Sequence, residues 1–142
     1  DELEKAIQDF PSGVQPKIRK DVTSGKYQLL WLTAWDWDTA PGEDANTISI
    51  LSNGYRRFIQ LTERRVRYAV PEPASGTIEL RGEVTEDGNI SISVLSGTQP
   101  IVLPQMAPGK SVRLTIDKQE RKTLSVQASE PADRSISRYT SE

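Results

Sequence analysis

The segment Lys26-Tyr-Gln-Leu-Leu-Trp-Leu-Thr-Ala-Trp-Asp-Trp37 decides the fold class of this chain. Side chains alternate between the two faces of a β-strand, so every second residue shares a face. One face would carry Tyr27, Leu29, Trp31, Thr33, Trp35 and Trp37, and the other Gln28, Leu30, Leu32 and Ala34. Because both faces are apolar, we expect a strand that is central in its sheet or covered on both sides.

Further strands are expected at roughly ten-residue spacing, separated by turn signals. We interpret Asn53-Gly54 and Glu86-Asp-Gly-Asn89 as hairpin turns, since Asn and Gly tolerate positive φ. The expected strands cover residues 47–51, 55–61, 64–70, 77–84, 90–94, 101–103, 111–116 and 123–126, with loops at 39–46, 104–109 and 117–122. This pattern predicts a mainly β, single-domain antiparallel meander, built as a barrel or strongly bent sheet rather than a sandwich.

The two ends of the chain are expected to differ from this β region. Leu3, Ala6, Ile7 and Phe10 have helical spacing, which predicts a short N-terminal helix over residues 2–10. Residues 11–25 hold two prolines and two glycines, which favours a loop with at most a short turn at 17–22. We expect one β-rich domain over 1–128 and a flexible tail over 129–142.

The composition excludes several classes of function. The 142 residues include no cysteine and no histidine, so disulfides, thiolate nucleophiles, haem ligation and Ser-His or Cys-His catalysis are all excluded. The net charge of −2 argues against a nucleic-acid partner, since such proteins carry a basic excess. We therefore expect no enzyme activity, no cofactor and no nucleic acid as a partner.

An acidic stretch is the one candidate for metal binding or acid–base chemistry. Asp36, Asp38, Glu43 and Asp44 supply four carboxylates, but the EF-hand template fails because Ala40 and Thr47 stand where ligands are needed. We expect a solvated acidic loop without a tight Ca²⁺ site.

All three tryptophans of the chain lie within seven residues, and with Tyr27 they are the candidate ligand-binding residues: Trp31, Trp35 and Trp37. Flat aromatic rings line apolar ligand sites or stack on sugars. Alternatively, Trp31 belongs to the core and the other two cover the end of a barrel. For a ligand wall, we expect Trp35 and Trp37 to be partly exposed and Trp31 to be protected.

Arginines gather over residues 56–67, and we take Arg56, Arg57, Arg65 and Arg67 as candidate partner-binding residues. Arginine interleaved with aromatic rings could bind single-stranded nucleic acid. The alternative is neutralisation by the acidic run 72–87 or by an acidic partner. Residues 88–109 carry no charge and would form either a buried hairpin or an exposed edge that Pro100 and Pro104 protect.

Ser24-Gly-Lys-Tyr-Gln-Leu-Leu-Trp-Leu-Thr33 resembles the first strand of plastid-lipid-associated proteins, also called fibrillins, and the Gly-x-Trp region of lipocalin-like barrels. Gly25 matches that motif, whereas Tyr27 replaces its usual Trp and Trp31 its usual Tyr. The resemblance implies a barrel that binds apolar, isoprenoid-type lipids at photosynthetic membranes without catalysis. It covers about ten residues, and the acidic stretch usual before the family's last strand is missing.

The function expected from these features is non-catalytic binding of an apolar or amphipathic, lipid-like ligand at the Trp-lined β surface. A structural or assembly subunit of an envelope or membrane-associated complex is the alternative, and a carbohydrate-binding module a weaker one. The expected partner is an apolar small molecule or a protein, with a membrane surface as a further candidate. The start at Asp1 fits a mature exported, lumenal or membrane-associated protein somewhat better than a cytoplasmic one.

Overall fold

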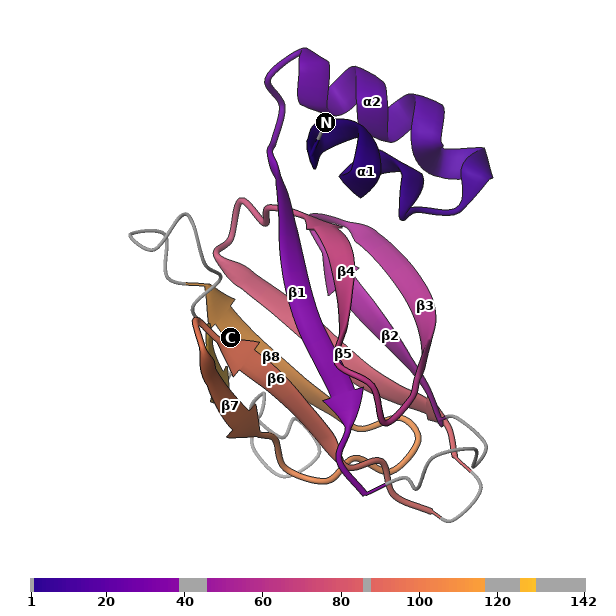
Figure 1. The fold of residues 1–142 in the computed structure, drawn as a ribbon, viewed down its shortest axis with the longest axis vertical. Helices are drawn as coiled ribbons and strands as arrows, with labels where there is room; N and C mark the ends of the chain where they lie inside the picture. The colour runs from indigo at the N-terminus through magenta and orange to yellow at the C-terminus, as the bar shows by residue number, and fades with distance from the viewer. Residues whose placement is uncertain (1, 39–45, 86–87, 117–125, 130–142) are drawn as a thin grey trace.

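The computed structural model describes residues 2–38, 46–85, 88–116 and 126–129 of the chain (Figure 1). Two helices come first, α1 (Glu2–Gln8) and α2 (Gln15–Thr23), with one turn of 3₁₀-helix at Ser12–Val14. The strands that follow are β1 (Leu29–Asp36), β2 (Asn46–Ser52), β3 (Tyr55–Leu61), β4 (Val66–Pro71), β5 (Thr77–Val84), β6 (Ile92–Ser96), β7 (Gln99–Val102), β8 (Ser111–Ile116) and β9 (Val126–Ser129).

The strands form two antiparallel sheets, one with the order β4-β1-β6-β7 and one with the order β3-β2-β5-β8-β9. Side chains from both sheets share one buried core, which includes Leu32, Ile50, Leu80, Ile92 and Leu114. The expected mainly β, antiparallel class with a short N-terminal helix is confirmed. The sheets are not closed into a barrel, because β4 and β7 end one sheet and β3 and β9 end the other.

Local turn chemistry fixes one hairpin but not the other that we expected. Asn53 and Gly54 adopt φ values of 54° and 82° and join β2 to β3 as predicted. The second expected hairpin, at residues 86–89, is wrong: β5 and β6 belong to different sheets and do not pair with each other. The turn expected at 117–122 lies outside the described residues, as do the loop expected at 39–46 and the tail expected at 129–142, except that Asn46 begins β2 and Ser129 ends β9.

The prediction of a loop over residues 11–25 is wrong, because α2 occupies Gln15–Thr23. Pro16 lies in the first turn of α2, where its missing N–H costs no helical hydrogen bond. Ile18 is buried on the face of α2 that packs against α1 and the sheet, with Val14 and Val22 packed beside it. Among the described residues, no helix is both long and apolar enough to cross a membrane.

The helices pack at one end of β1, over the outer face of the four-stranded sheet (Figure 1). Ile7 of α1 and Phe10 after it are buried in a second apolar cluster that also includes Ala69 of β4, and Leu29 and Trp31 pack against this cluster. β1 lies between β4 and β6, so it is a central strand as its sequence predicts, and the helices partly cover its outer face at Leu29 and Trp31.

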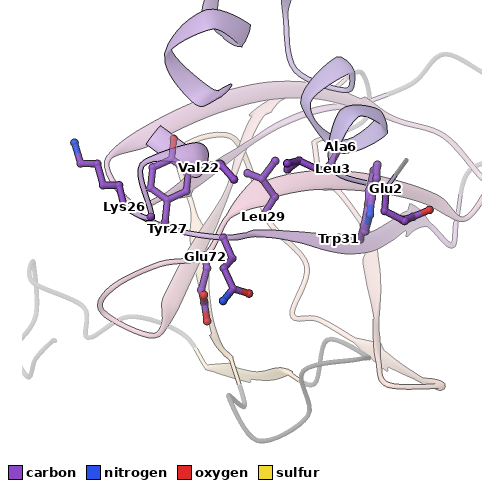
Figure 2. A pocket seen from close by; sticks show the side chains of 11 residues that line it. Glu2, Leu3, Ala6, Val22, Lys26, Tyr27, Leu29, Trp31 and Glu72 are labelled. Carbon is purple, nitrogen blue, oxygen red and sulfur yellow. The ribbon is translucent and has the colours of Figure 1, made fainter. Parts of the chain in front are cut away.

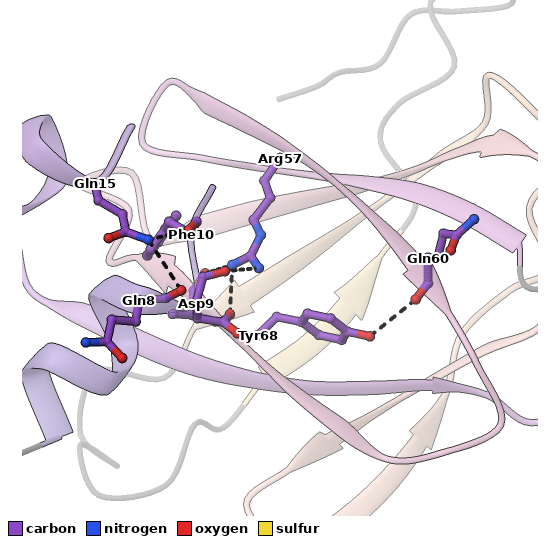
Figure 3. Close-up of polar contacts among 8 residues, drawn as sticks. Gln8, Asp9, Phe10, Gln15, Arg57, Gln60 and Tyr68 are labelled. Carbon is purple, nitrogen blue, oxygen red and sulfur yellow. Dashed lines mark hydrogen bonds and ion pairs between the residues drawn. The ribbon is translucent and has the colours of Figure 1, made fainter. Parts of the chain in front are cut away.

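Hydrogen bonds of Asp9, the residue after α1, connect the helices to the edge strand β4 (Figure 3). The Asp9 carboxylate accepts hydrogen bonds from the Ala69 N–H at 2.8 Å and from Arg57 Nη1 at 2.9 Å. Arg57 also donates to the Ala69 carbonyl at 2.9 Å and to the Asp9 carbonyl at 2.6 Å. The backbone of an edge strand is thus occupied at Ala69, which prevents pairing with another strand at that point.

Candidate functional site

A groove of about 640 Å³ lies between the helices and the start of β1 (Figure 2). Strand alternation places Tyr27, Leu29 and Trp31 along its floor, and Leu3 and Ala6 of α1 form the opposite wall. The other lining residues are Glu2, Val22, Gly25, Lys26, Gln28 and Glu72. This volume lies in the range typical of small-molecule sites.

The groove has a row of apolar side chains with a charged side chain at each end, and Glu72 lies below this row. In Figure 2, Lys26 lies beside Tyr27 at one end and Glu2 beside Trp31 at the other, with Leu29, Leu3 and Ala6 between them. The floor from Tyr27 to Trp31 spans about 13 Å at the rise of a β-strand. This arrangement suits an elongated ligand with an apolar body.

Tyr27 links this groove to a smaller pocket of about 190 Å³ on its other side, which Lys26 also lines. The Tyr27 hydroxyl donates to Asp21 Oδ2 at 3.1 Å, and Lys17 donates to the same oxygen at 3.2 Å. Burial and the hydrogen bond to Asp21 raise the pKa of Tyr27 to about 12. Tyr27 therefore stays protonated at neutral pH and acts as a hydrogen-bond donor rather than as a base.

Two of the tryptophans are covered by arginines from β4 and the turn before it. The Arg67 guanidinium lies 4.4 Å from the centre of the Trp31 ring, and that of Arg65 lies 4.2 Å from the Trp35 ring. The expectation that Trp35 is partly exposed and Trp31 protected is wrong. Trp35 is only 7% exposed, whereas Trp31 is partly exposed and lines the groove.

Trp37 lies just beyond β1 and is 46% exposed, as expected. Its backbone N–H donates to the Ser91 carbonyl at 3.0 Å, which extends the pairing of β1 with β6 by one residue. The four aromatic residues expected to form one wall therefore do not all lie in one site. Tyr27 and Trp31 line the groove, and Trp35 and Trp37 are not among its lining residues.

The four candidate partner-binding arginines also fall into two groups, two that form ion pairs within the protein and two that stack on tryptophan rings. Arg56 pairs with Glu79 at 3.1 Å, within the acidic run where we expected a partner, and also donates to Ser49 at 2.7 Å. Arg57 pairs instead with Asp9. Arg65 and Arg67 stack on tryptophans, and within the described part of the chain neither has a carboxylate inside salt-bridge distance.

The acidic stretch after β1 is described only in part, because residues 39–45 lie outside the described residues. Asp36 is buried and accepts hydrogen bonds from Asn46 Nδ2 at 2.7 Å and from the Asp38 N–H at 3.0 Å. No group of three or more Asp and Glu side chains suited to a metal occurs in the described ranges. The weakness of Ca²⁺ binding stays a prediction.

Several groove residues were not proposed from the sequence as site residues: Leu3, Ala6, Val22, Leu29 and Glu72. Leu3 and Ala6 belong to the apolar face of the expected helix, so the sequence does show that they face something apolar. The sequence contains no local signal that they face Trp31, since that contact depends on how α1 docks onto the sheet.

Comparisons with protein families, curated proteins and solved structures find no relative of this chain. No family model matches the chain, and no significant match was found among curated proteins or solved structures. The resemblance of residues 24–33 to plastid-lipid-associated proteins therefore stays a prediction.

Proposed function

We propose that this protein binds an apolar or amphipathic ligand without catalysis, in the groove between α1 and the start of β1. The observation that carries the proposal is the composition of that groove. Its floor is Leu29 between the rings of Tyr27 and Trp31, and its wall is Leu3 and Ala6, with Glu2, Lys26 and Glu72 as the charged lining residues. An apolar body would displace water from the centre, and a polar end would remain at the rim.

The chemistry of the lining residues supports binding rather than catalysis. The chain holds no histidine or cysteine, and the Tyr27 hydroxyl keeps its proton because its pKa is raised. The apolar site also lies outside the core between the sheets, under the helices. A lipid-like ligand would therefore enter from the surface and would not require the sheets to separate.

Sugar binding is less well supported by the same residues. Carbohydrate modules use exposed aromatic faces as stacking platforms. Here Arg67 lies over the Trp31 ring and Arg65 lies over the Trp35 ring, and Trp35 is also buried. Trp37 alone remains strongly exposed among the tryptophans.

Binding of an uncharged apolar fluorophore, N-phenylnaphthylamine, tests the proposal directly. We expect its fluorescence to rise with the wild-type protein and to fall when laurate is added as a competitor. Leu3→Glu should weaken binding of both by roughly tenfold, because a carboxylate would need to be desolvated at the groove wall.

Phe58→Glu is the matched control, since Phe58 is an exposed apolar residue on β3 of the other sheet. This variant should bind the fluorophore as the wild type does. Equal loss in both variants, or no binding by the wild type, would contradict the proposal.

A further inference from the structure

Arg65 and Arg67 differ from four other arginines of the described residues in how their charge is compensated. Arg19, Arg56, Arg57 and Arg81 each have a carboxylate oxygen within 3.1 Å or less, on Glu4, Glu79, Asp9 and Glu83 respectively. Arg65 and Arg67 are exposed and lie over indole rings, without a carboxylate within 4.0 Å among the described residues. Their charge is therefore held in place by stacking but not neutralised there.

The strand register places apolar side chains beside these two cations. Trp35 pairs with Ser93 of β6, and Ser93 pairs with Val102 of β7. Thr33 pairs with Arg67 of β4, on the same face of β1 as Trp35. Across the sheet, the outer face thus changes from stacked arginines on the β4 side to Val102, which is 63% exposed, on the β7 side. We call this surface the arginine–tryptophan face: Thr33, Trp35, Trp37, Arg65, Arg67, Ser93 and Val102. Trp35 and Ser93 are buried within it, and Trp37, Arg65, Arg67 and Val102 are its exposed members.

The residues of the arginine–tryptophan face include no acidic side chain. Residues 88–109 carry no charge, and the residues of β1 that share a face with Trp35 are also uncharged. Asp36 of β1 is buried and bonded to Asn46, and Asp38 and Glu63 border the face, next to Trp37 and two residues before Arg65 in the chain. The protein has a net charge of −2, yet the charges on this described face are those of two arginines.

We propose that the arginine–tryptophan face binds the surface of an anionic lipid bilayer. Guanidinium groups bind lipid phosphates in a bidentate manner, and tryptophan prefers the boundary between headgroups and acyl chains. An acidic protein segment would use the two arginines but would have less use for exposed Trp37 and Val102. The helices stand at the opposite end of β1 from Trp35 and Trp37, so this end of the face is not beneath them (Figure 1).

Flotation with lipid vesicles tests the proposal. The wild-type protein should float with vesicles made of equal parts phosphatidylglycerol and phosphatidylcholine, and should not float with vesicles of phosphatidylcholine alone. Arg65→Gln with Arg67→Gln should weaken binding roughly thirtyfold, the effect expected from the loss of two cations near an anionic surface. Arg65→Lys with Arg67→Lys keeps both charges but loses the bidentate contacts, so its affinity should lie between those of the wild type and the glutamine variant.

The control is Lys20→Gln with Lys110→Gln, which removes the same charge from exposed positions on α2 and before β8. It should bind the anionic vesicles as the wild type does. If the double arginine variant does not fold, Trp37→Ala replaces it, because Trp37 is exposed and its loss should weaken vesicle binding several-fold.

Three results would overturn the proposal. The first is no flotation of the wild type with anionic vesicles, and the second is equal loss in the arginine and lysine variants. The third is binding to soluble polyglutamate that exceeds binding to vesicles and that Trp37→Ala leaves unchanged, which would indicate an acidic protein partner instead.

Discussion

Arg57 of β3 and Asp9 after α1 form an ion pair at 2.9 Å, and both residues also bind the backbone of Ala69 on β4. The pair therefore joins three parts of the fold: the helical pair and the edge strands of both sheets. Arg57 also lies 5.1 Å from the ring centre of Phe10, which is buried beneath the helices. Docking of the helices, and hence the groove, depends on this contact.

We expect Arg57→Gln to lower the free energy of unfolding by about 2 kcal/mol, because it leaves the Asp9 carboxylate and the Ala69 carbonyl without charged donors. Urea denaturation followed by circular dichroism measures this change. Arg19→Gln is the control, since it breaks an ion pair with Glu4 that is exposed on the helices and should change stability little. Equal effects of the two substitutions would contradict this role of Arg57.

Arg65 is predicted to shield Trp35 from solvent. Arg65→Ala should increase quenching of tryptophan fluorescence by acrylamide and shift the emission to longer wavelength, with a stability loss of roughly 0.5–1 kcal/mol. Arg64→Ala serves as the control, because the Arg64 side chain is 82% exposed. Unchanged quenching in Arg65→Ala would mean that other groups bury Trp35.

Gly54 is predicted to be required for the turn between β2 and β3. Its φ of 82° is unfavourable for any residue with a Cβ, so Gly54→Ala should cost about 1–2 kcal/mol in thermal or urea unfolding. Gly13→Ala is the comparison, since Gly13 does not have positive φ and a Cβ there would meet no atom within 4 Å. The account of this turn would be wrong if both variants were equally stable.

Stability should fall at alkaline pH partly because of Tyr27. Burial raises the pKa of Tyr27 from 10.0 to about 12, so the folded protein holds this proton more tightly than the unfolded chain. The resulting stabilisation is fully present below pH 10 and is lost as the pH rises to about 12. Urea titrations across this range should show a shallower fall for Tyr27→Phe than for the wild type. Identical pH profiles would count against the Tyr27–Asp21 contact.

At acidic pH, the Tyr27–Asp21 contact should make stability fall as the pH is lowered, the reverse of its effect at alkaline pH. Although burial of Asp21 opposes the effect, hydrogen bonds from Lys17 and Tyr27 lower the pKa of this carboxyl. The stabilisation from Asp21 is therefore present above its unfolded pKa and is lost as the pH falls through the lower, folded value. Asp21→Asn should abolish this part of the acid sensitivity in the same urea titrations.

Most strands could be predicted because their evidence is local. The predicted ranges 55–61, 77–84 and 111–116 coincide with β3, β5 and β8, where apolar alternation and flanking turn residues agree. The sequence does not predict helix α2, because Gly13 and Pro16 favour a loop over residues 11–25. The spacing of Val14, Ile18 and Val22, four residues apart, was the signal for this helix.

The pairing of strands and the site could be predicted only in part, because they depend on contacts distant in sequence. β1 pairs with β4 and β6 rather than with its neighbour β2, and no local pattern specifies that choice. Tyr27 and Trp31 were correctly placed on one face. The burial of Trp35 could not be foreseen, since Arg65 covers it from a segment thirty residues away.

The most direct test of the proposed function is a titration with laurate followed by two-dimensional ¹H–¹⁵N NMR. The chain has three tryptophans, so three indole N–H signals report separately on the groove and on the rest of β1. We predict that laurate shifts the Trp31 indole signal and the amide signals of Leu3 and Val22, while the Trp37 indole and Phe58 amide signals stay in place. A Trp31 signal that does not move up to the solubility limit of laurate would contradict ligand binding in this groove.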